Sequence, residues 1–139
     1  MFSKRHVLPL LVAAVLLAFQ APTSAAQGFG GAVAVSGSDV LVGETANGSY
    51  PGIVYVFNKA GDGVWTETHQ ITAPDGAEAG DGFGAALHAH GAHLAVGASR
   101  SNEAWVFARQ DDGSWDAGVR LAADDVADGD GFGSGVLVG

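Results

Sequence analysis

The 139-residue sequence contains no cysteine. Disulfide bonds are therefore excluded, although small secreted domains commonly depend on them, and thiol nucleophiles and thiolate metal ligands are excluded as well. Basic residues are few, because six Lys and Arg stand against fifteen Asp and Glu, which gives a formal net charge of −9. A surface with this excess of negative charge repels nucleic acid and anionic membranes, so we expect neither as a partner.

Long apolar runs are also scarce, and the most extended one lies near the N-terminus. It reaches from Val7 to Phe19, follows a short basic start and is closed by small residues up to Ala26. This order is typical of a secretory signal peptide, and the run is shorter than the roughly 17–25 residues that a membrane span needs. We expect residues 1–26 to be a cleaved signal peptide and the mature protein to be secreted, periplasmic or on the cell surface, without membrane contact. An uncleaved anchor is the alternative.

The remainder of the chain is repetitive. The tripeptide Gly-Phe-Gly occurs at residues 28–30, 82–84 and 131–133, at spacings of 54 and 49 residues, and the landmarks between these tripeptides recur in the same order. Repeats of about fifty residues are typical of solenoids and propellers. The predicted organisation is a first repeat or blade at 27–81, a second at 82–130 and the start of a truncated third at 131–139.

Each full repeat predicts four short strands. These stretches are rich in Val, Ile, Tyr, Phe and Trp, which suit a pleated, half-buried surface, and no helical apolar period is sustained after the N-terminal segment. The third and fourth strands are joined through Asp-Gly, which is a strong hairpin signal. The expected strands are Phe29 through Val35, 40–43, 53–57 and 65–71 in the first repeat, and Phe83 through Ala89, 94–97, 104–107 and 115–121 in the second.

Four antiparallel strands in each repeat predict an all-β fold. We interpret the chain as a partial β-propeller of four-stranded antiparallel blades, with two blades and the first strand of a third after the signal peptide. A β-sandwich is the alternative, although a sandwich needs no internal period. Propellers close with about four to eight blades, so the chain reads as a fragment of a longer protein or a truncated product, and open blade faces should favour self-association.

Glycine and aromatic residues mark the same points of each repeat. Phe-Gly pairs open the repeats, a glycine follows the second strand, and the third strands contain aromatic residues. We expect the Phe-Gly pairs and the glycines after the second strands to be structural; they are Phe29, Gly30, Phe83, Gly84, Phe132, Gly133, Gly43 and Gly97. This pattern over residues 27–139 resembles the FG-GAP repeat, which is found in the integrin α-chain propeller and in many bacterial exported proteins. The resemblance implies a seven-bladed propeller outside the cytoplasm that serves in recognition or adhesion.

Many members of that family bind calcium through an Asp-x-Asp-x-Asp-Gly loop between the first two strands. Here the corresponding loops are residues 36–39 and 90–93, with the sequences Ser-Gly-Ser-Asp and His-Gly-Ala-His. Neither can wrap an ion that needs six to eight oxygen ligands. We therefore do not transfer calcium binding to this chain, and we expect no metal and no cofactor.

An acidic stretch at residues 124–130 has two interpretations. Asp124, Asp128 and Asp130 would suit a cation, but Val126 stands where a further alternating carboxylate is needed. Because calcium sites need many oxygen ligands, a solvated loop between blades is favoured over a metal site.

Histidines and tryptophans also have a functional and a structural interpretation. A His-x-His-x-x-His pattern that would suit zinc or copper is formed by His88, His90 and His93. The first repeat has no histidine at these places, so the fold does not require them. A platform for sugar stacking would be formed by Trp65, Trp105 and Trp115. Their recurrence with the repeat favours a packing role.

The sequence shows no recognisable catalytic constellation. No serine lies in a Gly-x-Ser-x-Gly elbow, and the glycine-rich pieces begin strands, whereas phosphate loops begin helices. We therefore expect a non-catalytic recognition or adhesion module, extracellular or periplasmic, whose partner is a protein or a glycan. The alternatives are the scaffold of a secreted enzyme whose catalytic domain lies beyond residue 139, and a structural repeat of a large surface protein.

Overall fold

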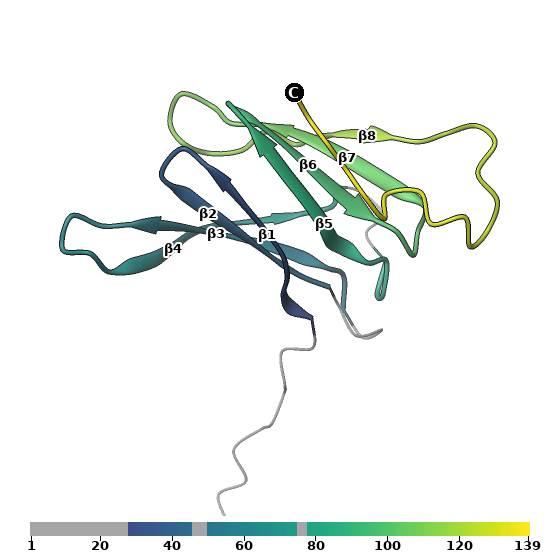
Figure 1. Cartoon of the computed structure of the whole chain (residues 1–139), viewed down its shortest axis with the longest axis horizontal. Helices are drawn as coiled ribbons and strands as arrows, with labels where there is room; N and C mark the ends of the chain where they lie inside the picture. The colour runs from purple at the N-terminus through teal and green to yellow at the C-terminus, as the bar shows by residue number, and fades with distance from the viewer. Residues whose placement is uncertain (1–27, 46–49, 75–77) are drawn as a thin grey trace, which may run out of the picture.

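A computed structural model of the chain describes residues 28–45, 50–74 and 78–139, and Figure 1 shows their arrangement. The regular structure in these residues consists of strands, which confirms the predicted all-β fold. The strands are β1 (Phe29–Ser36), β2 (Asp39–Glu44), β3 (Ile53–Lys59), β4 (Trp65–Thr72), β5 (Phe83–His90), β6 (His93–Ala98), β7 (Glu103–Ala108) and β8 (Val119–Leu121). The predicted signal peptide lies outside the described residues. Within the described ranges, no helix is long and apolar enough to cross a membrane.

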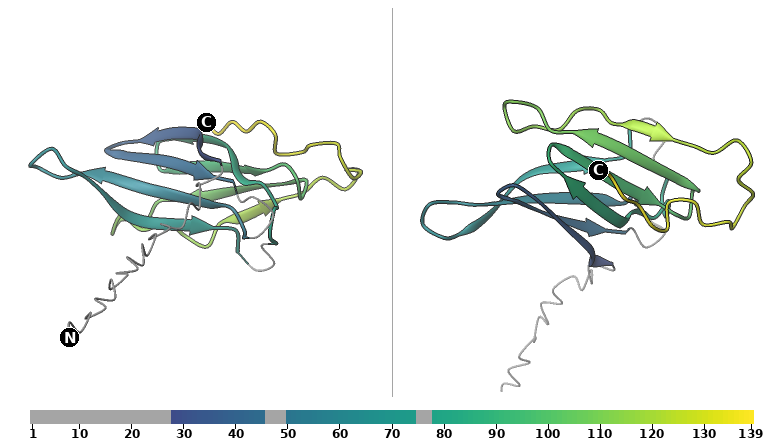
Figure 2. Two further views of the ribbon diagram at one scale, coloured as in Figure 1. Left: turned by 90° about the horizontal axis from the view of Figure 1, so that it is seen from below. Right: turned by 45° about the horizontal axis from the view of Figure 1, so that its top comes forward.

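The strands form two antiparallel four-stranded sheets in simple sequential order. The first sheet has the order β1-β2-β3-β4 and the second the order β5-β6-β7-β8. Figure 2 shows that the sheets stack, with β5 of the second sheet lying over β1 and β2 of the first. The two predicted blades are therefore present as two stacked sheets.

Tight turns connect the strands where the sequence has glycine. Ser36 pairs with Asp39 and His90 pairs with His93, so only two residues connect the first and second strands of each sheet. The first of these two residues is a glycine with positive φ in both sheets, Gly37 and Gly91, a conformation that costs glycine little. The place of the family's calcium loop is thus a two-residue turn.

The core lies between the two sheets. Alternate residues of β2 and β3, such as Leu41, Val54 and Val56, point from the first sheet toward Phe83, and all four are at most 1% exposed. Phe83 meets Phe107 edge to face with ring centroids 6.1 Å apart, a geometry that adds about 0.5–1.5 kcal/mol beyond burial of the same area. The period-two alternation of the strands supplies the apolar face that each sheet presents to the other.

Glycines of the repeat motif allow the backbones of successive repeats to touch. A Cβ on Gly43 of β2 would overlap the carbonyl oxygen of Gly84 in β5. A Cβ on Gly97 of β6 would overlap the carbonyl oxygen of Gly133 in the same way. The Phe-Gly pair of one repeat therefore packs on the second-strand glycine of the repeat before it, and only glycine fits there.

The structure corrects two strand predictions. The stretch predicted as a strand at 115–121 is regular only at Val119–Leu121, because Asp116 Oδ1 accepts the backbone N–H groups of Ala108 and Gly118 and so replaces the ladder there. The predicted first strand of a third blade is also wrong: residues 131–139 form a turn and irregular chain. Among the described residues no strand pairs with this segment, and a strand needs a hydrogen-bonded neighbour.

Candidate functional site

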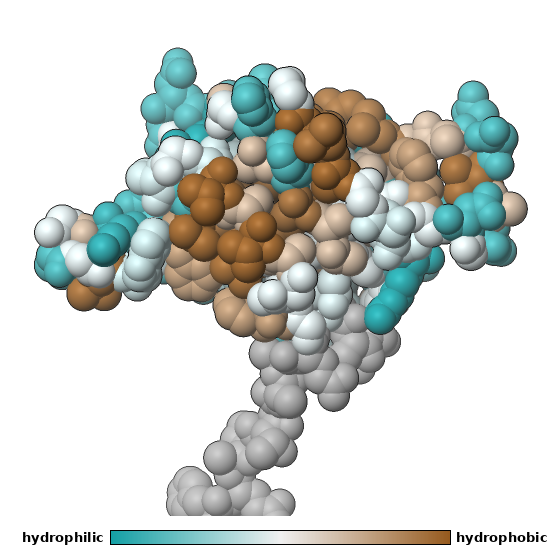
Figure 3. All heavy atoms as spheres, in the orientation of Figure 1, coloured by the Kyte–Doolittle hydropathy of each residue, from teal (hydrophilic) through white to brown (hydrophobic). Residues whose placement is uncertain are grey.

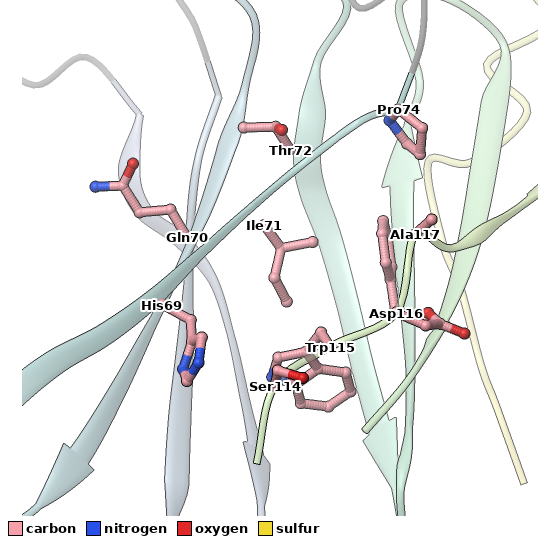
Figure 4. A pocket seen from close by; sticks show the side chains of 10 residues that line it. His69, Gln70, Ile71, Thr72, Pro74, Ser114, Trp115, Asp116 and Ala117 are labelled. Atoms are coloured by element: carbon pink, nitrogen blue, oxygen red, sulfur yellow. The ribbon is translucent and has the colours of Figure 1, made fainter. Parts of the chain in front are cut away.

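A cavity of about 280 Å³ opens between the outer strand of the first sheet and the connection from β7 to β8 (Figure 4). One wall belongs to β4 and the other to the loop that carries Trp115. Ten residues line it: His69, Gln70, Ile71, Thr72, Pro74, Phe107, Ser114, Trp115, Asp116 and Ala117. The cavity thus combines a hydrophobic base with a polar rim, which is the usual composition of a small-molecule site.

The alternation of β4 decides which side chains reach the cavity. Figure 4 shows His69 and Ile71 directed toward Trp115, whereas Gln70 points away from it. Ile71 is 5% exposed and belongs to the core between the sheets. The imidazole of His69 is therefore the polar group that β4 presents to the space above the indole.

The opposite wall is held by short local hydrogen bonds. A single bridge joins Trp115 to Arg109. Ser114 Oγ donates to Asp112 Oδ1 at 2.6 Å, and the Ser114 backbone N–H donates to the same oxygen at 2.9 Å. These bonds fix the rim before any ligand arrives, so that ordering it costs little on binding.

The carboxylate that holds Ser114 is that of Asp112, which lies outside the cavity lining. The hydrogen bonds from the Ser114 hydroxyl and backbone N–H lower the pKa of the Asp112 carboxyl below its ordinary value. Asp112 is therefore a weaker base than an ordinary aspartate. The Ser114 hydroxyl donates to this weak base, which leaves the oxygen without the activation that a nucleophile requires.

Two polar contacts join the two sheets. Asp81 is buried, and its Oδ1 accepts the backbone N–H groups of Gly52 (3.1 Å) and Phe83 (2.9 Å). Asp39 of β2 pairs with Arg109, with 2.9 Å between Oδ2 and Nη2. These charged groups fix how the sheets are aligned, because each bridges residues from both sheets.

The phenylalanines of the three Gly-Phe-Gly motifs have different surroundings. Phe83 is fully buried between the sheets, and Phe132 is partly buried beside the second sheet. Phe29 is 49% exposed and contacts the ring of Tyr55 edge to face at 5.6 Å. Contacts between successive repeats are made by Phe83 and by the glycine pairs Gly43–Gly84 and Gly97–Gly133. Phe29 instead contacts Tyr55 of its own repeat, and a Cβ on Gly30 would meet no atom within 4 Å. None of these motif residues lines the 280 Å³ cavity.

Neither candidate metal group assembles. Over the described part of the chain, no three His, Asp or Glu side chains gather in an arrangement that holds an ion. His88 Nδ1 instead accepts the backbone N–H of Val138 at 3.2 Å. In the acidic loop, Asp130 Oδ2 accepts the N–H of Ala127, whose carbonyl accepts an N–H of Asn102.

The tryptophans do not form one platform. Trp105 lies in the core, and Trp65 is half-exposed in the hairpin, where Lys59 Nζ lies 5.9 Å from the centre of its ring. Trp115 alone lines the cavity.

Sequence reasoning missed His69, Asp81 and Arg109. The position of His69 two residues before the core residue Ile71 would have placed it on the inner face of β4. Nothing in the sequence brings Arg109 to Asp39, because that contact depends on how the sheets stack.

Two stacked antiparallel sheets of four strands, built from one repeated sequence with glycine at their contacts, have the arrangement of consecutive β-propeller blades. A comparison with protein families matches residues 65–114 to the FG-GAP repeat. The chain therefore contains an FG-GAP repeat, and the resemblance predicted from sequence is confirmed over these residues. The matched span runs from β4 through β7, so it includes strands of both sheets and the cavity wall on β4. Of the opposite wall it includes Phe107 and Ser114, and it ends just before Trp115. No curated protein and no solved structure matches the chain.

Proposed function

We propose that this chain is a non-catalytic recognition module that acts outside the cytoplasm and binds a saccharide in the cavity between the two sheets. The observation that carries the proposal is the cavity of about 280 Å³ with the indole of Trp115 and the side chain of Ile71 at its base and polar groups at its rim. A sugar ring has apolar C–H faces that stack on an aromatic ring and hydroxyl groups that hydrogen-bond around it.

The polar groups of the rim suit such a ligand. The imidazole of His69 both donates and accepts hydrogen bonds, and the carboxylate of Asp116 accepts them. The indole N–H of Trp115 is buried and has no acceptor among the described residues. An unpaired buried donor costs roughly 1–3 kcal/mol, so a shift of the indole that let a ligand hydroxyl accept from this N–H would strengthen binding.

The lining residues support binding over catalysis. The Ser114 hydroxyl donates a hydrogen bond to Asp112, whose pKa is lowered, and an activated hydroxyl needs a stronger base beside it. We therefore assign no catalytic residue, and we treat the module as an adhesion or recognition element with the export signal that residues 1–26 predict.

The test is an array of mono- and oligosaccharides probed with the full chain, followed by calorimetric titration of the saccharide that binds best. His69→Ala should weaken binding by roughly tenfold, the value of one or two hydrogen bonds. Thr66→Ala is the matched control, because Thr66 is exposed on the same strand and does not line the cavity. Absence of saccharide binding, or equal affinity of the wild type and His69→Ala, contradicts the proposal.

A further inference from the structure

The first sheet has an apolar face that no described residue covers. Val33 and Val35 of β1 are 55% and 62% exposed, and Figure 3 shows hydrophobic side chains gathered over the region of β1 and β2. The pairing register places these valines in rows with residues of β2 and β3. We call this surface the open face; it consists of Phe29, Val33, Val35, Val40, Val42, Tyr55 and Phe57.

The second repeat shows what covers such a face. Its equivalent residues are Phe83, Leu87, Ala89, Leu94, Val96, Trp105 and Phe107, which belong to or pack against the core between the sheets. Five of them are at most 6% exposed. The inner face of the first sheet covers these residues. A surface like the open face is therefore complementary to the inner face of a second sheet with the same repeated sequence.

The second sheet carries a surface of that kind on its far side. The inner face of the first sheet, which covers the second repeat, has an equivalent in the second sheet. In the order of the repeat, its residues Ala34, Leu41, Val54, Val56 and Ile71 correspond to His88, Ala95, Ala104, Val106 and Leu121. Ile71 is 5% exposed, whereas Leu121 is 45% exposed. The described residues therefore cover the inner face of the second sheet only in part.

Residues 131–139 provide that partial cover. Gly133 packs on Gly97 as Gly84 packs on Gly43, and Val138 N donates to His88. The segment 131–139 thus lies over the second sheet in the place that β5 takes over the first sheet. We call this place on the second sheet the first-strand site. Figure 2 shows residues 131–139 crossing the second sheet. It leaves a cavity of about 230 Å³ against the sheet, lined in part by Leu121.

The strand β1 has the same sequence pattern as this segment. Residues 29–35 and 132–138 both read Phe-Gly-x-x-Val-x-Val. The segment 132–138 arrives alone, whereas β1 brings the open face of three paired strands with it. A sheet that entered with β1 would therefore bury more apolar area, at about 25 cal/mol per Å².

We propose that a second copy of this chain docks head to tail, with its open face on the second sheet of the first copy and its β1 in the first-strand site that residues 131–139 otherwise occupy. The interface is heterologous, because different surfaces of the two copies meet. Residues 131–139 compete with the incoming β1 and so limit the association.

Light scattering coupled to size exclusion tests this on the full chain over a range of concentrations. The wild type should associate as concentration rises. Val35→Glu on the open face should shift the association midpoint at least tenfold upward. Gly133→Ala should shift it downward, because a Cβ there overlaps the carbonyl oxygen of Glu103 and releases the competing segment. Val64→Glu is the control, since Val64 is 58% exposed in the β3–β4 turn, outside both faces.

Mixing variants tests the head-to-tail geometry. Leu121→Glu should likewise shift the association midpoint at least tenfold upward. A mixture of Val35→Glu with Leu121→Glu should give a one-to-one dimer at concentrations at which each variant alone is monomeric, because each variant keeps the surface that the other lacks. All variants share the same N-terminal residues, so any contribution of those residues cancels. A wild type that stays monomeric, a Gly133→Ala midpoint that does not fall, or a mixture that does not dimerise overturns the proposal. A monomeric wild type would assign the open face to a sheet of another polypeptide.

Discussion

Replacing Phe83 with alanine should cost far more stability than replacing Phe29, although both residues hold the same place in the repeat. Phe83 is fully buried and packs on Phe107, and truncation of a buried phenylalanine costs about 3–5 kcal/mol. Phe29 is 49% exposed and keeps one edge-to-face contact with Tyr55. Loss of about half the hydrophobic burial of a phenylalanine side chain and of one aromatic pair should lower the free energy of unfolding of Phe29→Ala by roughly 1–2 kcal/mol.

Urea unfolding followed by tryptophan fluorescence measures both free energies. A domain of this kind has a total stability of about 5–15 kcal/mol, so Phe83→Ala should remove a large part of it and lower the melting temperature by roughly 10–20 °C. The measurement belongs at a concentration at which light scattering shows monomer, because docking of a second copy would bury Phe29. Equal losses for the two variants, or a larger loss for Phe29→Ala, would refute the assignment of the core to the space between the sheets.

Three further predictions concern the contacts between and within the sheets. Gly43→Ala should destabilise by about 1–3 kcal/mol, because its Cβ overlaps the carbonyl oxygen of Gly84, whereas Gly61→Ala, with open space around it, should be close to neutral in the same urea assay. Arg109→Ala should cost about 3 kcal/mol, because it leaves the buried carboxylate of Asp39 without its ion pair; a melting curve like that of the wild type would contradict this. The hydrogen bond from Tyr55 Oη to Glu44 (2.7 Å), together with burial and nearby negative charge, raises the pKa of Tyr55 from 10.0 to about 12. The stability that this hydrogen bond contributes is therefore complete below pH 10 and is lost as the pH rises through about 12. Urea unfolding should show this loss for the wild type and not for Tyr55→Phe.

Period and turn chemistry made the architecture predictable. Alternating apolar residues and the Asp-Gly pairs determine hairpins locally. Gly63 and Gly113 have the positive φ that such turns use. The fourth strand of the second repeat could not be predicted as well. Asp116 competes for the backbone N–H groups of Ala108 and Gly118, and propensity within a strand does not reveal which side-chain oxygen will replace a ladder bond.

The cavity was less predictable than the fold because its walls come from different sheets. Trp115 was recognised as aromatic and recurrent, but the repeat gave no reason to separate it from Trp105, which lies in the core. What distinguishes them is burial, because Trp105 belongs to the core cluster, whereas Trp115 is partly buried and packs against that cluster. This difference in burial follows from how the sheets stack, which sequence periodicity does not specify.

The third Gly-Phe-Gly motif clarifies what the repeated signal encodes. Residues 131–133 do not begin a strand, and yet Gly133 packs on Gly97 as Gly84 packs on Gly43. The motif therefore specifies a contact with the preceding sheet, and the strand that follows it depends on hydrogen-bonded neighbours. This explains why Phe29 is half-exposed, since among the described residues no sheet precedes it. The same reasoning links exposure to assembly: a sheet that covered the open face would be expected to place Phe29 in surroundings like those of Phe83.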